Sequence, residues 1–462
     1  MDGSQTINPY LAGNFAPVAD EADFELVVTG ELPSGLAGAL YRNGPNPQFA
    51  PRDDHHWFAG DGMIHGFFIE NGRARYRNRF VRTPKWRAEN AAGKALFGTF
   101  GNPMTTDPSV VGQDSGVANT NIVWHAGRLL ALEEGHMPTE MDPASLETRG
   151  YAERYGGNVT AHPKIDAETG EMVWFAYSAG QTPLNSTVAY GVTSPSGEVL
   201  RRDDFEAPYM SMVHDFLVTR RHVLFPILPL SGSLERAMRG GPAFAWEPDK
   251  GAFVGVMARD AGVDTIRWFE TEPCYVFHPM NAWEEGSKIF ADVMEYPSAP
   301  LFPNADGSRR GDVFARLVRW TIDLGDASNV VKREPLDDMA GEFPRFDERR
   351  AGLGYRHGWF AATTRRPGEI RFDAIAHIDL ATGGRTTYEF ANGDVTSEPV
   401  FVPRSAGAAE GDGWLLSVVY RGETDRSDLV VFDTADITAG PLATAHVPRR
   451  VPFGFHGNWR PL

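Results

Sequence analysis

The chain has 462 residues, with 44 basic and 61 acidic side chains, so its net charge is −17 at pH 7. Such an acidic protein is a poor partner for nucleic acid, and the single cysteine, Cys274, excludes an internal disulfide framework and a zinc–thiolate cluster. No apolar run approaches the roughly 20 residues of a membrane span, and the N-terminus lacks a basic stretch followed by an apolar one. We therefore expect a cytoplasmic protein.

The predicted elements are mostly short strands. Residues 1–50, rich in Pro, Gly and Asn, indicate an extended lead-in, and turn signals at 60–62 and 71–72 suit β-hairpins. Further turns are expected at 166–171, 194–197 and 381–384, and a surface loop at 404–412. Helical patterns are confined to 86–98 and 231–240. Many short strands over this length favour an all-β chain, either a propeller or an array of sandwiches.

Four histidines lie in apolar or sharply turning segments: His162 in VTAHPK, His214 in SMVHDF, His278 in CYVFHPMNAW and His456 in FGFHGNW. A buried imidazole needs a partner for each ring nitrogen, and neutral imidazole is the commonest protein ligand for Fe, Zn, Cu and Ni. We predict that the four meet on one metal ion. A radial architecture would bring one ligand from each of several units to a central axis. The alternative is that they are ordinary core or surface histidines.

Other histidines compete for this role. The segment RDDHHWF, with His55 and His56, is polar and follows Pro51, which favours a solvated loop. His125 and His136 flank the apolar run LLALEE and are expected at the surface, at strand ends. These contexts favour ordinary surface positions over metal ligands.

Three carboxylates follow or interrupt apolar stretches: Glu134 after LLAL, Glu342 in AGEFPRF and Glu398 in TSEPVFV. A lone charge there is expensive, whereas a histidine that binds a metal usually donates its second N–H to a carboxylate or carbonyl. The three glutamates would suit three of the four histidines. Alternatively, each caps a turn or pairs with an arginine, and Arg345 is close in sequence to Glu342.

These segments together resemble the carotenoid cleavage oxygenases, the retinal pigment epithelial membrane protein family. The signature LPSGLAGALYRNGPNP is followed by HHWFAGDGMIHG, and the four histidine segments, GEFPRFD and SEPVFVPR follow in the family's order. The resemblance covers nearly the whole chain. It implies a single domain over residues 1–462, a seven-bladed β-propeller with a loop-and-helix cap over one face.

The same resemblance implies a site. Non-haem Fe(II) would lie on the axis, with Glu134, Glu342 and Glu398 contacting three of its ligands and one histidine left without such a partner. Thr120 matches a position beside an open coordination site, and aromatic residues should line a dry tunnel. The ligands implied are His162, His214, His278 and His456.

The implied activity is cleavage of a C=C bond with O2 to give two carbonyl products. The segments ALFGTFGNPMTTDPSV and ANTNIVWHAGRLLALEEGHMP resemble the bacterial lignostilbene dioxygenase-like branch, which acts on phenolic aromatic alkenes. Phe58 matches the residue that stacks on the substrate ring. The branch's phenol-anchoring Tyr and Lys are replaced by Phe100 and Glu133. Glu133 then either accepts a hydrogen bond from a phenol or points to solvent.

Three other functions stay open. Loss of phenol recognition would favour an apolar apocarotenoid or carotenoid substrate. A propeller used only as a binding module would need none of these histidines and glutamates, and a zinc or calcium propeller hydrolase would need more carboxylate ligands. The segment SGSLERAMRGGPAFAW is expected to be a surface helix and loop, and no membrane contact is expected.

Overall fold

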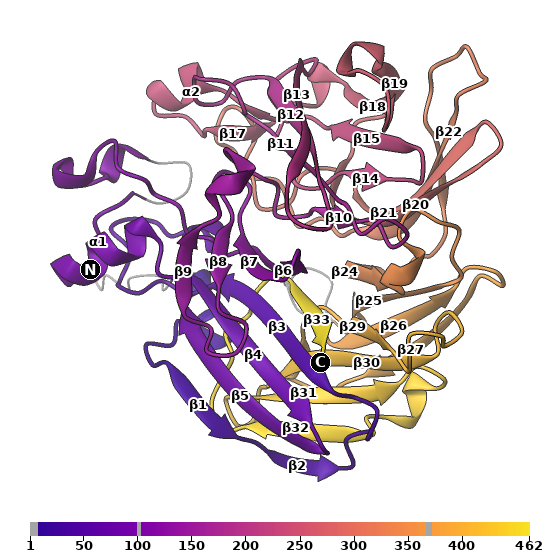
Figure 1. The fold of residues 1–462 in the computed structure, drawn as a ribbon. Helices are drawn as coiled ribbons and strands as arrows, with labels where there is room; N and C mark the ends of the chain where they lie inside the picture. Colours follow the sequence, from indigo (N-terminus) through magenta and orange to yellow (C-terminus); the bar gives the residue numbers. More distant parts are fainter. Residues whose placement is uncertain (1–7, 99–102, 366–371) are drawn as a thin grey trace.

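The computed structural model describes residues 8–98, 103–365 and 372–462. Within these residues, seven antiparallel sheets are arranged around a central axis as a β-propeller (Figure 1). This confirms the predicted fold class. We number the sheets as blades 1 to 7 in chain order, beginning with the sheet that contains the hairpin of residues 62–80.

Blade 1 contains five strands and blades 2 to 4 contain four each. Blade 1 is β1 (Ala22–Glu25), β5 (Arg73–Phe80), β4 (Gly62–Glu70), β3 (Gly38–Pro45) and β33 (Gly457–Pro461). Blade 2 is β6 (Asn121–His125), β7 (Arg128–Leu132), β8 (Thr139–Met141) and β9 (Thr148–Tyr151). Blade 3 is β10 (Lys164–Ile165), β11 (Met172–Ala176), β12 (Thr187–Thr193) and β13 (Val199–Glu206). Blade 4 is β14 (Leu217–Val218), β15 (His222–Ile227), β18 (Ala252–Ala258) and β19 (Arg267–Thr271).

Blades 5 and 6 contain four strands each, and blade 7 contains six. Blade 5 is β20 (Tyr275–Glu285), β21 (Lys288–Tyr296), β22 (Arg316–Asp323) and β23 (Lys332–Pro335). Blade 6 is β24 (Ala340–Phe346), β25 (His357–Thr363), β26 (Ala374–Asp379) and β27 (Gly384–Glu389). Blade 7 is β2 (Val27–Gly30), β32 (Ala443–Val447), β31 (Arg426–Asp433), β30 (Gly413–Arg421), β28 (Val395–Thr396) and β29 (Val400–Pro403).

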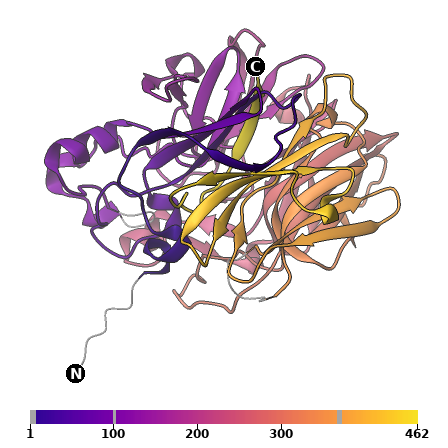
Figure 2. The ribbon, with the colours of Figure 1, turned by 90° about the horizontal axis from the view of Figure 1, so that it is seen from below.

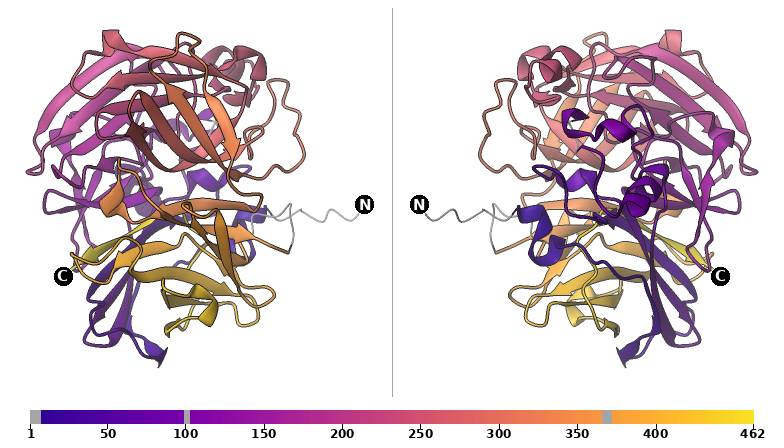
Figure 3. Two further views of the ribbon diagram at one scale, coloured as in Figure 1. Left: turned by 90° about the vertical axis from the view of Figure 1, so that its right-hand side faces the viewer. Right: turned by 90° about the vertical axis from the view of Figure 1, so that its left-hand side faces the viewer.

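The two ends of the chain close the ring. The C-terminal strand β33 pairs with β3 of blade 1, and the N-terminal strand β2 pairs with β32 of blade 7. In Figures 2 and 3 the indigo N-terminal strands accordingly lie beside the yellow C-terminal ones. Because each of these sheets combines strands from the two ends of the chain, the first and last blades are linked and the ring is closed.

The hairpins follow the turn chemistry of the sequence. Asn71 and Gly72, both at positive φ, connect β4 to β5, which is the arrangement that a two-residue hairpin turn requires. The predicted turns at 166–171, 194–197 and 381–384 join β10 to β11, β12 to β13 and β26 to β27. The predicted loop at 404–412 joins β29 to β30.

Apolar residues fill the spaces between neighbouring blades. Leu40 and Phe67 of blade 1, for example, belong to one buried cluster with Val418 and Val431 of blade 7. Since each blade is covered on both faces, inner strands such as β11 are buried along their whole length rather than on alternate residues. This packing holds the first strand of each blade close to the axis.

The helices are short. α1 (Pro84–Ala92) begins two residues before the first predicted helical region and ends before Gly93, and α2 (Leu234–Met238) occupies only the middle of the second. Both lie on the same side of the view in Figure 1, with the small ribbon β16 (Leu230–Gly232) and β17 (Phe244–Trp246). Residues of the lead-in, of the α1 region and of the 299–315 segment line one cavity, and the cap over one face of the propeller stays a prediction.

Candidate metal centre and cavity

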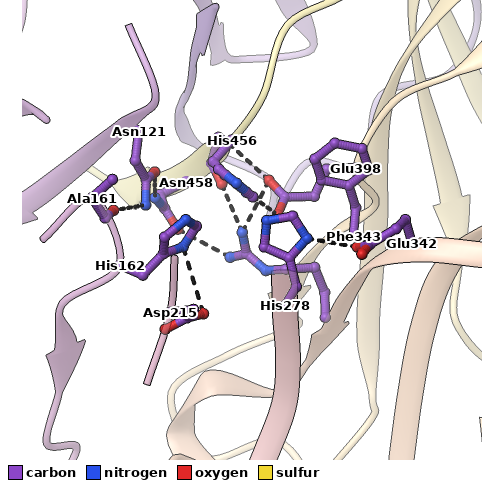
Figure 4. A network of polar contacts seen from close by, with 12 residues as sticks. Asn121, Ala161, His162, Asp215, His278, Glu342, Phe343, Glu398, His456 and Asn458 are labelled. Carbon is purple, nitrogen blue, oxygen red and sulfur yellow. Dashed lines mark hydrogen bonds and ion pairs between the residues drawn. The ribbon is translucent and has the colours of Figure 1, made fainter. Parts of the chain in front are cut away.

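Six of the seven blades place a histidine or a glutamate in or beside the strand nearest the axis. Figure 4 labels all of these residues except His214. In blades 3, 4 and 1 the histidine directly precedes the strand or lies a few residues before it, and in blade 5 it lies within β20. Blades 6 and 7 supply glutamates from β24 and from between β28 and β29. The residues are His162, His214, His278, Glu342, Glu398 and His456.

The four predicted histidines come together on the axis. The Nε2 atom of His214 lies 3.1 Å from that of His162 and 3.1 Å from that of His278. His456 joins the group, with its ring centroid 4.5 Å from that of His162. All four side chains are buried, and one nitrogen from each lies within 4.8 Å of the others. Such a group is able to hold a metal ion.

Three of the four imidazoles have a glutamate at Nδ1. His214 contacts Glu134, while His278 Nδ1 lies 2.6 Å from Glu342 Oε2. In the third pair, His456 Nδ1 lies 3.0 Å from Glu398 Oε1. A carboxylate accepts, so each Nδ1 donates and the opposite Nε2 exposes its lone pair.

His162 is the histidine without a glutamate. Its Nδ1 instead lies 3.6 Å from Oδ2 of Asp215, which is buried and forms an ion pair with Lys164 at 2.7 Å. Asp215 follows His214 directly in the sequence, so one short segment supplies a candidate ligand from blade 4 and a carboxylate that faces His162 of blade 3. The sequence alone left the identity of this histidine open.

The electrostatics favour neutral imidazole at three positions. Burial, followed by the neighbouring histidines, lowers the pKa of His162 well below its ordinary value. Burial also lowers the pKa of His278 and His456, although a glutamate opposes this in each case. At His214 burial lowers the pKa but the charge of Glu134 raises it overall. Neutral imidazole is the form that binds a metal ion.

The donor set itself fits a metal cation. Two Nε2 lone pairs that face each other at 3.1 Å repel, since neither nitrogen has a proton to share when both Nδ1 atoms donate to glutamate. A cation between them turns this repulsion into ligation. Two of the glutamates have further partners, because the hydroxyl of Tyr177 donates to Glu134 at 2.6 Å and Arg345 lies 3.2 Å from Glu398.

Backbone irregularities aim two of these side chains. His278 lies where the pairing of β20 with β21 shifts register, and Glu342 lies where β24 shifts against β25. The residue after Glu342, Phe343, has a φ of 55°. Bulges of this kind are common beside functional sites because they turn a side chain out of the regular alternation.

A cavity of about 740 Å³ opens onto the histidines. Its lining residues include many aromatic side chains, among them Trp57, Phe58, Phe277, Phe302 and Phe455. This volume is within the range of small-molecule sites. Three of the four histidines reach the cavity wall, so a molecule in the cavity lies against the candidate metal centre.

The structure places two predicted pocket residues in this wall. Phe58 packs edge-on against Phe455 and Phe277, with ring centroids 5.6 and 6.4 Å apart. Thr120 also lines the cavity, and its hydroxyl donates to Asn119 Oδ1 at 2.9 Å. Phe100, the other predicted substrate contact, lies outside the described residues.

Glu133 faces the cavity, and the solvent-facing alternative does not hold. The side chain is buried, and its Oε2 accepts hydrogen bonds of 2.8 Å from the backbone N–H groups of Val117 and Ala118. Strand β7 ends at Leu132, so Glu133 and Glu134 are no longer bound to alternate faces. Both therefore reach the interior.

Three histidines assigned to the surface from sequence are placed differently. His55 is buried beneath the lead-in, where Asn8 donates to its carbonyl oxygen, and burial lowers its pKa to about 4. His125 is also buried, with Nε2 3.1 Å from Gly170 O. His136 lines the cavity and forms an ion pair with Glu133. Local polarity gave no signal for any of them, because segments distant in the chain cover them.

The fold and the four converging imidazoles define a β-propeller with a candidate metal centre on its axis. The sequence matches the retinal pigment epithelial membrane protein family over residues 15–461, and the chain belongs to that family.

Named relatives cover the chain almost completely. It is 40% identical to isoeugenol monooxygenase of Pseudomonas nitroreducens, with 98% of each chain covered. It is 38% identical to lignostilbene-alpha,beta-dioxygenase isozyme III of Sphingomonas paucimobilis, with 97% of this chain and 96% of that one covered. The crystal structure of Pseudomonas brassicacearum lignostilbene dioxygenase superposes with a TM-score of 0.95 at 35% identity, with 99% of each chain covered.

Within the described parts of the chain, no helix has both the length and the apolar character needed to cross a membrane.

Proposed function

We propose that this protein is a non-haem iron(II) oxygenase that cleaves the C=C bond of a phenolic aromatic alkene with O2, giving two carbonyl products. The observation that supports this most directly is the convergence of four buried imidazoles, three of which line one wall of the cavity. The named relatives, which include an isoeugenol monooxygenase and a lignostilbene dioxygenase, support the same class of reaction and substrate.

The donor set favours iron over calcium or a zinc–thiolate site. Four neutral imidazoles include no hard oxygen ligand and no thiolate. An imidazole–metal bond of about 2.1 Å places adjacent nitrogens about 3.0 Å apart at right angles and about 3.4 Å apart in a tetrahedron. Two observed Nε2–Nε2 separations of 3.1 Å fall between these values, so one ion would be able to contact both nitrogens of each pair.

Bound iron would supply the activation of O2, and the alkene supplies the electrons. In this proposal the three glutamates hold Nδ1–H and thereby keep each Nε2 lone pair directed at the axis. The aromatic wall excludes water, and Phe58 stacks on the substrate ring. The methyl group of Thr120 borders the open side of the site.

Glu133 is the proposed acceptor for the substrate hydroxyl. A carboxylate offers about four lone-pair sites. Two on Oε2 are taken by the backbone of Val117 and Ala118, and His136 takes one on Oε1. One site therefore remains for a donor in the cavity, and a phenol O–H matches it. A buried phenol without an acceptor would cost roughly 1–3 kcal/mol.

The test is metal analysis combined with turnover of a substrate panel. The protein reconstituted with Fe(II), and the same protein with Zn(II) as the control, is given O2 and isoeugenol, 4-hydroxystilbene, 4-methoxystilbene or an apocarotenal. We expect about one iron per chain, aldehyde products from the hydroxylated alkenes and no products with zinc. Cleavage of the apocarotenal alone would replace the phenolic proposal with the apocarotenoid one. Absence of both iron binding and cleavage would leave a propeller that acts only by binding.

A further inference from the structure

The polar end of the cavity contains a second residue, His136, which the proposed reaction does not use. Its Nδ1 faces Oε1 of Glu133, and its Nε2 lies 3.8 Å from Oδ1 of Asp114. Carboxylate oxygens therefore face both ring nitrogens, and their negative charge favours the imidazolium form of His136.

The surrounding segment fixes the position of this ring. Asp114 accepts hydrogen bonds from the Tyr151 hydroxyl at 3.0 Å and from the backbone N–H of Gly116 at 2.8 Å. A Cβ added at Gly116 would lie only 3.0 Å from His136 Cδ2, so the imidazole packs directly against this backbone. Three separate segments, 114–118, 133–136 and the strand of Tyr151, thus meet at the end of the cavity and build a site.

The charges around His136 show what the ring does for Glu133. Burial raises the pKa of Glu133, but the charge of His136 and the two backbone hydrogen bonds bring it below the ordinary value. Burial lowers the pKa of His136, whereas Glu133 and then Asp114 raise it to about 9. The titratable groups that face the ring are Glu133, Asp114 and Tyr151, and burial raises the pKa of Tyr151 strongly. His136 therefore keeps Glu133 ionised in a buried place.

We propose that His136 is the positioning residue for phenol recognition: held between Glu133 and Asp114, it fixes the Glu133 carboxylate as an ionised acceptor with one lone pair open to the cavity. This rests on the proposed phenolic substrate. The site then selects a neutral hydroxyl, which can donate, over a methoxy group, which cannot. A phenolate is disfavoured as well, because the two carboxylates outnumber the single imidazolium.

Two ligands without a cleavable alkene allow binding to be measured separately from turnover. The iron-containing protein is titrated with 4-ethylphenol and with 4-ethylanisole, which have no alkene to cleave, and the ratio of their Kd values is measured. A hydrogen bond to a charged group predicts that the wild type prefers the phenol roughly 10-fold or more. His136→Leu should reduce this preference to within about twofold. His136→Gln, which can donate to Glu133 but has no charge, should retain part of it.

The control and the outcomes are distinct. His125→Gln changes another buried histidine that does not line the cavity, and it should keep the wild-type ratio. An unchanged ratio in His136→Leu, with a wild-type circular dichroism spectrum, overturns the role of His136 and leaves the phenolic substrate standing. A wild-type ratio near one overturns both. If the Leu variant does not fold, an unchanged ratio in His136→Gln overturns the role of His136 instead.

Discussion

Two of the glutamates that contact the histidines differ in whether an arginine forms an ion pair with them. The effect of this difference on stability can be measured without any metal. Glu398 forms an ion pair of 3.2 Å with Arg345, a guanidinium whose side chain is only 11% exposed. Glu342 contacts His278 and the backbone N–H of Phe343, and no arginine forms an ion pair with it in the described structure. Replacing each with Gln should therefore have unequal effects on folding.

The expected difference follows from the pKa of Glu398. Burial raises this pKa, but Arg345 and then His456 lower it to about 2, against an ordinary value of 4.5. Each pKa unit corresponds to roughly 1.4 kcal/mol, so the ionised Glu398 carboxylate contributes about 3 kcal/mol to the free energy of unfolding at neutral pH. Glu398→Gln removes this contribution and leaves Arg345 to its other partners. Glu342→Gln weakens one hydrogen bond, at about 1 kcal/mol.

The assay is urea denaturation of chelator-treated protein, followed by circular dichroism. We expect the free energy of unfolding to fall by about 3 kcal/mol in Glu398→Gln and about 1 kcal/mol in Glu342→Gln. Since the folded pKa of Glu398 is below the unfolded one, its contribution is present above about pH 4.5 and disappears as the pH falls through about 2. Equal losses in the two variants at neutral pH would refute the argument from Arg345.

The other predictions concern metal, substrate and pH. Replacing any one of the four converging histidines with Ala should abolish turnover and reduce bound iron well below one per chain by elemental analysis, and full activity in a metal-free preparation would contradict this. Changing each of the three contacting glutamates to Gln should lower metal affinity or activity on the order of 10–100-fold, measured by metal titration and initial rates. Glu133→Ala should reduce the ratio of 4-hydroxy to 4-methoxy alkene turnover roughly 10-fold, whereas an equal ratio in both proteins would remove the acceptor role. Because the folded pKa of His136 is about 9, its stabilising effect should be complete below about pH 6.5 and be lost as the pH rises through about 9; a wild-type and a His136→Gln protein that lose equal stability over this range would show that the pair does not form.

The sequence determined the class of fold because its signals were local. Gly-rich and Asn-rich turns at regular intervals between short apolar runs specify antiparallel hairpins, and the positive φ values of Asn71 and Gly72 are what those residue types allow. The four histidines could also be identified from the sequence, because burying an imidazole among apolar neighbours is unfavourable unless both ring nitrogens have partners. Phe58 was predicted from the family resemblance. The three glutamates were predicted from the cost of a buried charge, and the resemblance implied the same residues.

Tertiary structure decided the relations between blades. His162, His214 and His278 are 52 and 64 residues apart, and Glu342 is another 64 residues on, so only closure of the ring makes them neighbours. It also made His162 the histidine with Asp215 in place of glutamate. His136 became a cavity residue, and His55 became buried, because other segments of the chain cover them. A residue's own neighbours fix its local conformation, whereas the charge and solvent around it depend on contacts that chain folding alone creates.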